Sequence, residues 1–143
     1  MLSFSLLSSI WATYLLSVLN VGCSTTITVP SNEISGLEYL YNSTDGDSWL
    51  FRRKPGSGEV WNFTDGSNPC VPGWQGVNCV QVSGSSGGDE VWSVISLELG
   101  EYNLHGTLPA ELSLVSGLTY LNLYANRLHH RIPSDIAKLS ALA

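Results

Sequence analysis

The clearest pattern in the chain is a repeat of its apolar positions every 24 residues, from residue 94 to residue 142. Leu121 and Leu123 alternate as one face of a short strand, and the later apolar positions turn inward from the rest of the coil. One coil cannot bury these groups alone, so each coil needs a stacked neighbour. The equivalent pairs are Val94 and Leu118, Leu97 and Leu121, Leu99 and Leu123, Leu104 and Leu128, Leu108 and Ile132, Pro109 and Pro133, Leu112 and Ile136, Val115 and Leu139, and Leu118 and Leu142.

A fixed period of this length, with the pattern L-x-x-L-x-L-x-x-N-x-L, is typical of a leucine-rich repeat solenoid. The second repeat reads LTYLNLYANRLHHRIPSDIAKLSA and the first VISLELGEYNLHGTLPAELSLVSG. Both resemble the plant-type, extracellular class of leucine-rich repeat. The resemblance implies an α/β solenoid wound as a right-handed coil, with strands over residues 91–99 and 119–123.

The segment before the repeats resembles the N-terminal cap of the same proteins. The stretch CVPGWQGVNC at residues 70–79 is similar to the C-x-W-x-G-V-x-C segment that closes such caps. A second stretch, GLEYLYNSTDGDSWLFRR, resembles the cap helix and the turn that follows it in the form common to protist and algal members. The resemblance covers residues 31–143 and implies a helical, disulfide-bonded cap over residues 24–90. The repeats then occupy residues 91–143, two complete and a third begun.

Three positions depart from the repeat pattern. Tyr102 stands where the next repeat has Asn126, so we expect an incomplete ladder of asparagine side chains at the first coil. His130 stands where the first repeat has Gly106, and glycine tolerates backbone angles that histidine resists. The array stops at Ala143, so we expect a truncated product, because solenoids normally need three repeats and a polar end cap. The apolar residues expected to face no further coil are Leu128, Ile132, Ile136 and Leu139.

The cap sequence predicts one helix and a cluster of aromatic anchors. Ser31 can cap a helix whose apolar spacing runs through Ile34, Leu37, Leu40 and Tyr41. Turn-forming residues at 42–47 end it. The four large aromatic residues Trp49, Phe51, Trp61 and Trp74 are expected to fill the cap and cover the end of the solenoid core. A carbohydrate-binding aromatic strip is the alternative. Residues 83–89 form a flexible insertion.

The first 23 residues have no charged side chain and predict a secretory signal peptide. An uncleaved membrane anchor and a lipoprotein site at Cys23 are the alternatives. Export predicts that the protein is secreted or held at the cell surface. If the leader is removed, Cys70 and Cys79 remain as an even pair, which predicts a disulfide rather than two free thiols. Asn42 and Asn62 each begin a glycosylation sequon, NST and NFT.

Charge and composition exclude several functions. The net charge is −6, which argues against nucleic acid or an anionic membrane surface as a partner. No cofactor motif is present. His105 and His129 are repeat-equivalent and should stack, but no further ligand completes a metal site. Glu98 and Glu101 lie on one open strand, so a glycosidase pair is a poor interpretation, and we expect no catalysis.

The remaining candidate site is the concave strand face, whose side chains point away from the leucine core. Tyrosine is favoured at interfaces because it combines a large contact area with a hydroxyl group. The predicted ligand-binding residues are Ser96, Glu98, Glu101, Tyr120, Asn122 and Tyr124, with Gly100 and Ala125 between them. The sequence therefore predicts a recognition module for an extracellular protein, peptide or glycan. A receptor-like kinase ectodomain fragment and a structural wall or matrix glycoprotein are the alternatives.

Overall fold

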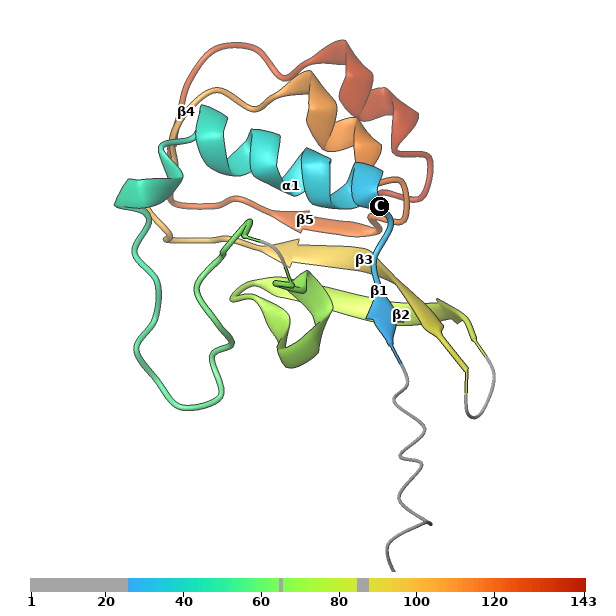
Figure 1. Cartoon of the computed structure of the whole chain (residues 1–143). Coiled ribbons are helices and arrows are strands. Elements are labelled where there is room, and N and C mark those ends of the chain that lie inside the picture. The colour runs from blue at the N-terminus through green and yellow to red at the C-terminus, as the bar shows by residue number, and fades with distance from the viewer. Residues whose placement is uncertain (1–25, 65, 85–87) are drawn as a thin grey trace, which may run out of the picture.

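The computed structural model describes residues 26–64, 66–84 and 88–143, so the predicted leader at 1–23 lies outside the described residues. The centre of the fold is a sheet whose long middle strand is β3, Glu90–Glu98 (Figure 1). One edge of β3 pairs in parallel with β1, Ile27–Thr28, and with β5, Tyr120–Asn122. Its other edge pairs antiparallel with β2, Val77–Ser83.

The two coils stack with the spacing that the sequence repeat predicts. Ser96, Leu97 and Glu98 pair with Tyr120, Leu121 and Asn122, so each partner lies 24 positions further along the chain. A second parallel pair, β4 (His105–Gly106) with β6 (Arg127–Leu128), continues the stack beyond the first bend. Two repeat-equivalent residues, Glu101 and Ala125, both have a positive φ, 65° and 53°. The strands expected at 91–99 and 119–123 are therefore present within one or two residues at each end.

Helical segments lie along one side of the sheet (Figure 1). They are α1 (Ser31–Ser43) from the cap and two 3-10 helices, η3 (Ala110–Leu114) and η4 (Ser134–Lys138), one from each coil. Gly36 allows α1 to approach η3 closely, because a Cβ there would lie 2.9 Å from Cγ2 of Val115. The Asn32 side-chain amide also donates to the Leu114 carbonyl across 2.9 Å. The cap helix thus takes the place of a preceding coil.

The first coil is buried more completely than the second. Leu97, Leu99 and Leu104 are fully buried, whereas their repeat equivalents Leu121, Leu123 and Leu128 are only partly buried against the same core. Ile132 is 75% exposed. The expectation that Leu139 would face no further coil is wrong. It is 4% exposed and belongs to the core, because η4 packs back against η3 and turns this side chain inward.

The cap contains the expected aromatic core. Trp49, Trp61 and Trp74 are all buried, so they do not form a carbohydrate-binding strip. The Trp49 and Trp61 rings meet edge to face with centroids 4.9 Å apart, and Trp61 lies 5.5 Å from Trp74. Each indole N–H also has an acceptor: Trp49 donates to the Thr44 carbonyl at 3.0 Å and Trp61 to the Gln75 carbonyl at 2.8 Å. These two buried indole N–H groups are therefore hydrogen-bonded, as is usual for buried tryptophan.

The start of α1 differs from the expectation. Pro30 occupies the N-cap position, and Ser31 is the first helical residue with no side-chain capping bond. The polar anchor of the helix is instead Glu33, which is buried. Its carboxylate accepts from the Ser93 hydroxyl at 2.7 Å and from the Val94 backbone N–H at 2.8 Å. Glu33 therefore fixes the cap helix directly to the first repeat strand.

Two further links close the cap. A disulfide joins Cys70 in the short helical segment η2, Pro69–Gly73, to Cys79 in β2, with their Cα atoms 5.6 Å apart. The buried side chain of Gln75 accepts from the Arg52 backbone N–H at 2.7 Å and donates to the Arg52 carbonyl at 2.8 Å. Gln75 thereby bonds both backbone groups of Arg52, as a neighbouring strand would, and fixes the long loop after α1.

Truncating equivalent leucines in the two coils should have unequal effects. Leu104→Ala empties a fully buried site and should lower the free energy of unfolding by about 2–5 kcal/mol. Leu128→Ala removes a partly exposed side chain and should cost clearly less. Urea unfolding of both variants measures the difference. Equal losses would contradict the proposed asymmetry in packing.

Replacing Glu33 should destabilise the junction between cap and repeats. Glu33→Ala leaves the Ser93 hydroxyl and the Val94 N–H buried without their acceptor, which should cost about 1–3 kcal/mol or more. Glu38→Ala, on the exposed face of the same helix, is the matched control and should change stability by less than about 0.5 kcal/mol. Thermal unfolding followed by circular dichroism compares the two, and a Glu33 variant as stable as the control would contradict the role.

Candidate recognition surface

The candidate site lies on the face of the sheet opposite α1, where neighbouring strands align their outward residues. Ser96 on β3 pairs with Asn78 on β2 and with Tyr120 on β5. Two residues further along β3, Glu98 pairs with Asn122. The structure therefore brings four of the six predicted site residues together in two adjacent rows and adds Asn78, which the sequence reasoning did not select.

The third row is built around a tyrosine that lies over a glycine. A Cβ at Gly100 would lie 2.5 Å from the Tyr124 ring, so only glycine lets the ring settle on the backbone of the first coil. The nearby Glu101 carboxylate raises the pKa of the Tyr124 phenol above its usual value. Tyr124 is 60% exposed and Tyr120 48%. The surface thus presents two aromatic side chains, one of which lies near a carboxylate.

A polar hollow of about 190 Å³ adjoins this face where the first coil meets the cap. Asn78 donates its side-chain amide to Glu98 across 2.9 Å on one side of it. On the other side the Arg52 guanidinium lies 5.4 Å from the centre of the Tyr102 ring. Arg52 comes from the long loop after α1, and the fold brings it to the same hollow as Glu98. The hollow therefore combines a cation, a carboxylate and an amide.

Ser96 is the exception among the predicted contacts. It is 9% exposed, and its hydroxyl has no hydrogen-bond partner among the described residues. Flanked by Asn78 and Tyr120 in the register, it forms the floor of the surface rather than its contact layer.

The departure at Tyr102 has a structural role. In the second coil, Asn126 accepts from the Leu104 N–H at 2.9 Å and donates to the Leu99 carbonyl at 2.7 Å, so it ties the two coils together. Tyr102 cannot make these bonds and is buried instead, with its ring 6.0 Å from that of Phe51. Burial raises the pKa of its phenol. The asparagine position of the first coil is thus used to join the repeats to the aromatic cap.

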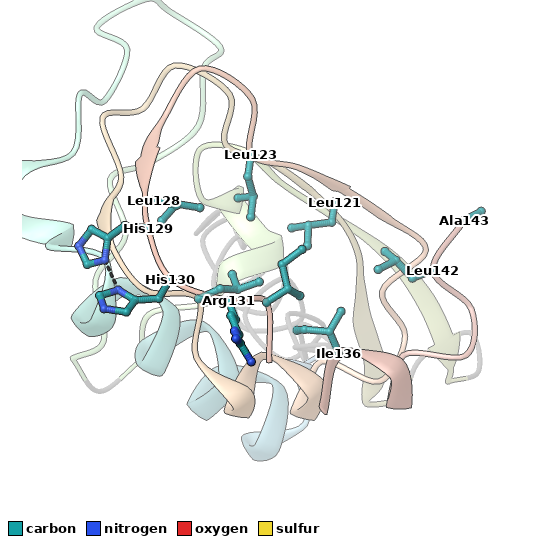
Figure 2. Close-up of a pocket in the computed structure, with 11 residues that line it drawn as sticks. Leu121, Leu123, Leu128, His129, His130, Arg131, Ile136, Leu142 and Ala143 are labelled. Carbon is teal, nitrogen blue, oxygen red and sulfur yellow. Dashed lines mark hydrogen bonds between the residues drawn. The ribbon is translucent and has the colours of Figure 1, made fainter. Parts of the chain in front are cut away.

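A larger hollow, of about 500 Å³, lies on the other side of the second coil and is lined mainly by leucines (Figure 2). Leu121, Leu123 and Leu128 point into it, and their equivalents in the first coil are covered by the second. Its chemistry is therefore that of a coil-to-coil interface and not of a site with placed polar groups.

The histidines stack as predicted. The His105 and His129 rings lie 5.6 Å apart, and the two Nδ1 atoms of His129 and His130 face each other at the rim of the leucine-lined hollow. His130 keeps a positive φ of 71° where Gly106 has 137°. Within the described residues no group of three potential ligands is placed to hold a metal ion. The same residues include no helix long and apolar enough to cross a membrane.

Comparison with known proteins supports a leucine-rich repeat fold. The chain is 37% identical over 98 residues to the receptor-like protein kinase HSL1 of Arabidopsis thaliana, a match that covers 68% of this chain but 8% of that protein. The LRR ectodomain of the receptor kinase SOBIR1 from Arabidopsis thaliana superposes with a TM-score of 0.56 at 24% identity, over 82% of this chain and 52% of that one.

A leucine-rich repeat protein from Bacteroides eggerthii gives a TM-score of 0.41 at 22% identity over 63% of this chain and 12% of that one. No protein-family model matches the chain. The repeats and the coil register, together with the similarity to the SOBIR1 ectodomain, support a leucine-rich repeat fold for this chain. It spans less than a tenth of HSL1 and about half of the SOBIR1 ectodomain.

The Glu101 carboxylate near Tyr124 makes the titration of this tyrosine testable. The carboxylate favours the neutral phenol, so the pKa of Tyr124 lies above the usual value of 10.0, and removing the charge of Glu101 should lower this pKa. Glu101→Gln should shift one tyrosine transition to lower pH in ultraviolet difference spectra. The same step should be missing in Tyr124→Phe. An unchanged titration in Glu101→Gln would show that Glu101 does not act on Tyr124.

Proposed function

We propose that this chain is a secreted or cell-surface recognition module that binds an extracellular protein, peptide or glycan on its concave strand face. The observation that supports this proposal best is the pair of exposed tyrosines, Tyr120 on β5 and Tyr124 in the turn that follows this strand. Aromatic residues held in place in the free protein lose little conformational entropy when they bind, so they suit the centre of an interface.

The polar residues around the tyrosines would set the specificity. Glu98 and Glu101 are exposed acceptors, Asn122 offers an amide, and Arg52 contributes the single cation that adjoins them in the described part of the chain. A ligand that fits must therefore offer both hydrogen-bond donors and an apolar surface. Ser96 would act only by supporting Tyr120 from below.

We propose that residues 24–90 form a plant-type cap, helical and disulfide-bonded, and that residues 91–143 form a right-handed repeat coil. Residues 1–23 would act as a secretory signal. The buried aromatic cluster, the Cys70–Cys79 link and the register of β3 with β5 support this division. No catalytic role is assigned to the described residues.

The second candidate is the ectodomain part of a receptor-like kinase. The specific observation in its favour is the 98-residue match to HSL1, at 37% identity. Both candidates use the same concave face, and they differ in what the complete gene product contains. A structural wall or matrix glycoprotein would not depend on Tyr120 and Tyr124 and is therefore separated by a binding experiment.

Selection against the immobilised full chain tests the concave face. A random peptide library displayed on phage and a printed glycan array serve as the two probes. We expect ligands that bind the wild-type chain and lose about tenfold or more in affinity on Tyr120→Ala/Tyr124→Ala, since interface tyrosines often contribute more than about 1.4 kcal/mol.

Tyr39→Ala is the matched control, because Tyr39 is also a half-exposed tyrosine but lies on α1. Binding should survive this substitution. Ligands that bind the double variant as tightly as the wild-type chain would show that the binding site does not include Tyr120 and Tyr124. If neither probe yields a ligand, the structural wall or matrix glycoprotein becomes the favoured alternative.

A further inference from the structure

We propose that Asn62 carries an N-linked glycan whose first sugar packs into a hollow of the cap, which is lined by residues 59–64 and 66–68 and by η2. The inference rests on the export that the proposed function includes, because the transferase acts in the secretory pathway. The inference distinguishes the Asn62 sequon from the Asn42 sequon, although the two look equivalent in the sequence. It also assigns the Asn62 glycan a surface on the protein with which it is in contact.

The two sequons lie in very different surroundings. Asn62 is exposed on a loop, and its side-chain oxygen accepts from the Thr64 N–H at 3.1 Å, while Thr64 is exposed as well. Asn42 lies in the last turn of α1. The hydroxyl of its Thr44 is fully buried and donates to the Leu40 carbonyl at 2.6 Å. Only the Asn62 sequon keeps both of its functional side chains at the surface of the folded cap.

Asn62 also stands at the rim of a hollow of about 360 Å³, within the range of roughly 300–1,000 Å³ that small-molecule sites occupy. The walls include Glu59, Val60 and Asn68, and the hollow also borders the buried Trp74. Trp74 is fixed by its indole N–H, which donates to the Ser67 hydroxyl at 3.1 Å. The hollow is therefore formed in the protein before any sugar is attached.

The lining suits a sugar that is tethered at Asn62. The Val60 side chain is half-exposed and offers an apolar contact to the C–H face of a pyranose. The Glu59 carboxylate can accept from sugar hydroxyls. The Asn68 side chain is already oriented, since it donates to the Ile27 carbonyl at 2.9 Å and accepts from the Cys70 N–H at 2.8 Å. A contact at this point would brace the loop, η2 and β1 together.

The covalent step is a glycosyl transfer from a lipid-linked oligosaccharide pyrophosphate. The Nδ2 atom of Asn62 forms a bond to the anomeric carbon of the first sugar. The bond from that carbon to the pyrophosphate oxygen breaks, the lipid pyrophosphate leaves with the bonding pair, and the amide nitrogen loses one proton. No oxidant or reductant is needed. Because the acceptor amide is at the rim, the first sugar begins next to the hollow.

Expression of the full chain in a eukaryotic secretory host tests the modification. Glycopeptide mapping of protein from the medium should place a glycan on Asn62. Asn62→Gln and Thr64→Ala should lose it, whereas Thr64→Ser, which keeps the sequon, should retain it. Protein that is secreted without a glycan on Asn62 would overturn this inference and leave the proposed function standing. Protein that stays in the cytosol with its first residues intact would overturn both.

Trimming tests the contact. Material cut back to one sugar per site should melt roughly 3–6 °C higher than material from which the glycans are removed completely. Asn42→Gln should keep this difference. Val60→Ser, at a half-exposed wall position, should leave the sugar-free protein unchanged but abolish the gain. Equal melting temperatures of the trimmed and sugar-free wild-type chain would show that the glycan projects into solvent and would overturn the packing.

Discussion

The fold depends on the inability of any single coil to bury its own leucines. Each coil has a strand of the main sheet, a second strand of two residues and one 3-10 helix. The apolar side chains of a coil are covered only when another element lies against them. Leu104 and Leu128 show this dependence within one molecule, because identical residues at equivalent positions are fully and partly buried according to what lies next to them. Hydrogen bonds such as those of Asn126 fix the spacing of the coils, but apolar burial supplies the reason for stacking.

The same constraint explains why the cap is so rich in aromatic residues. The first coil has a neighbour only on one side, so its other side needs a cover that is not itself a coil. The Trp49, Trp61 and Trp74 rings provide large apolar area from a loop with little regular structure, and α1 covers the leucines at the level of η3. Tyr102 extends this cover into the repeat itself, at the cost of the asparagine bonds that the next coil makes.

The sequence could predict the features that occur in both repeats, but not the contacts of residues that have no equivalent in the other repeat. The 24-residue spacing gave the strands, their register and the outward positions Tyr120, Asn122 and Tyr124, because each depends on a pattern that occurs twice. Glu33, Asn78 and Arg52 occur once. Their partners lie 61, 20 and 50 positions away in the chain, so no local pattern marks them. Ser96 shows the same limit at a position that the repeat did predict. Strand alternation correctly places it on the outward face, but its burial depends on the flanking residues Asn78 and Tyr120.

The junction between cap and first coil is where stability and recognition meet. Arg52 lies over Tyr102, and beside them Asn78 orients Glu98 on the concave face. The loop that carries Arg52 is held by Gln75, and β2, which carries Asn78, is tied to η2 through Cys79. A polar group that is held by several independent contacts loses little freedom when it binds a ligand. The cap therefore does more than cover the end of the core: it supplies a cation and an amide to a surface whose aromatic residues come from the repeats. The binding face that we propose is thus assembled from both parts of the chain.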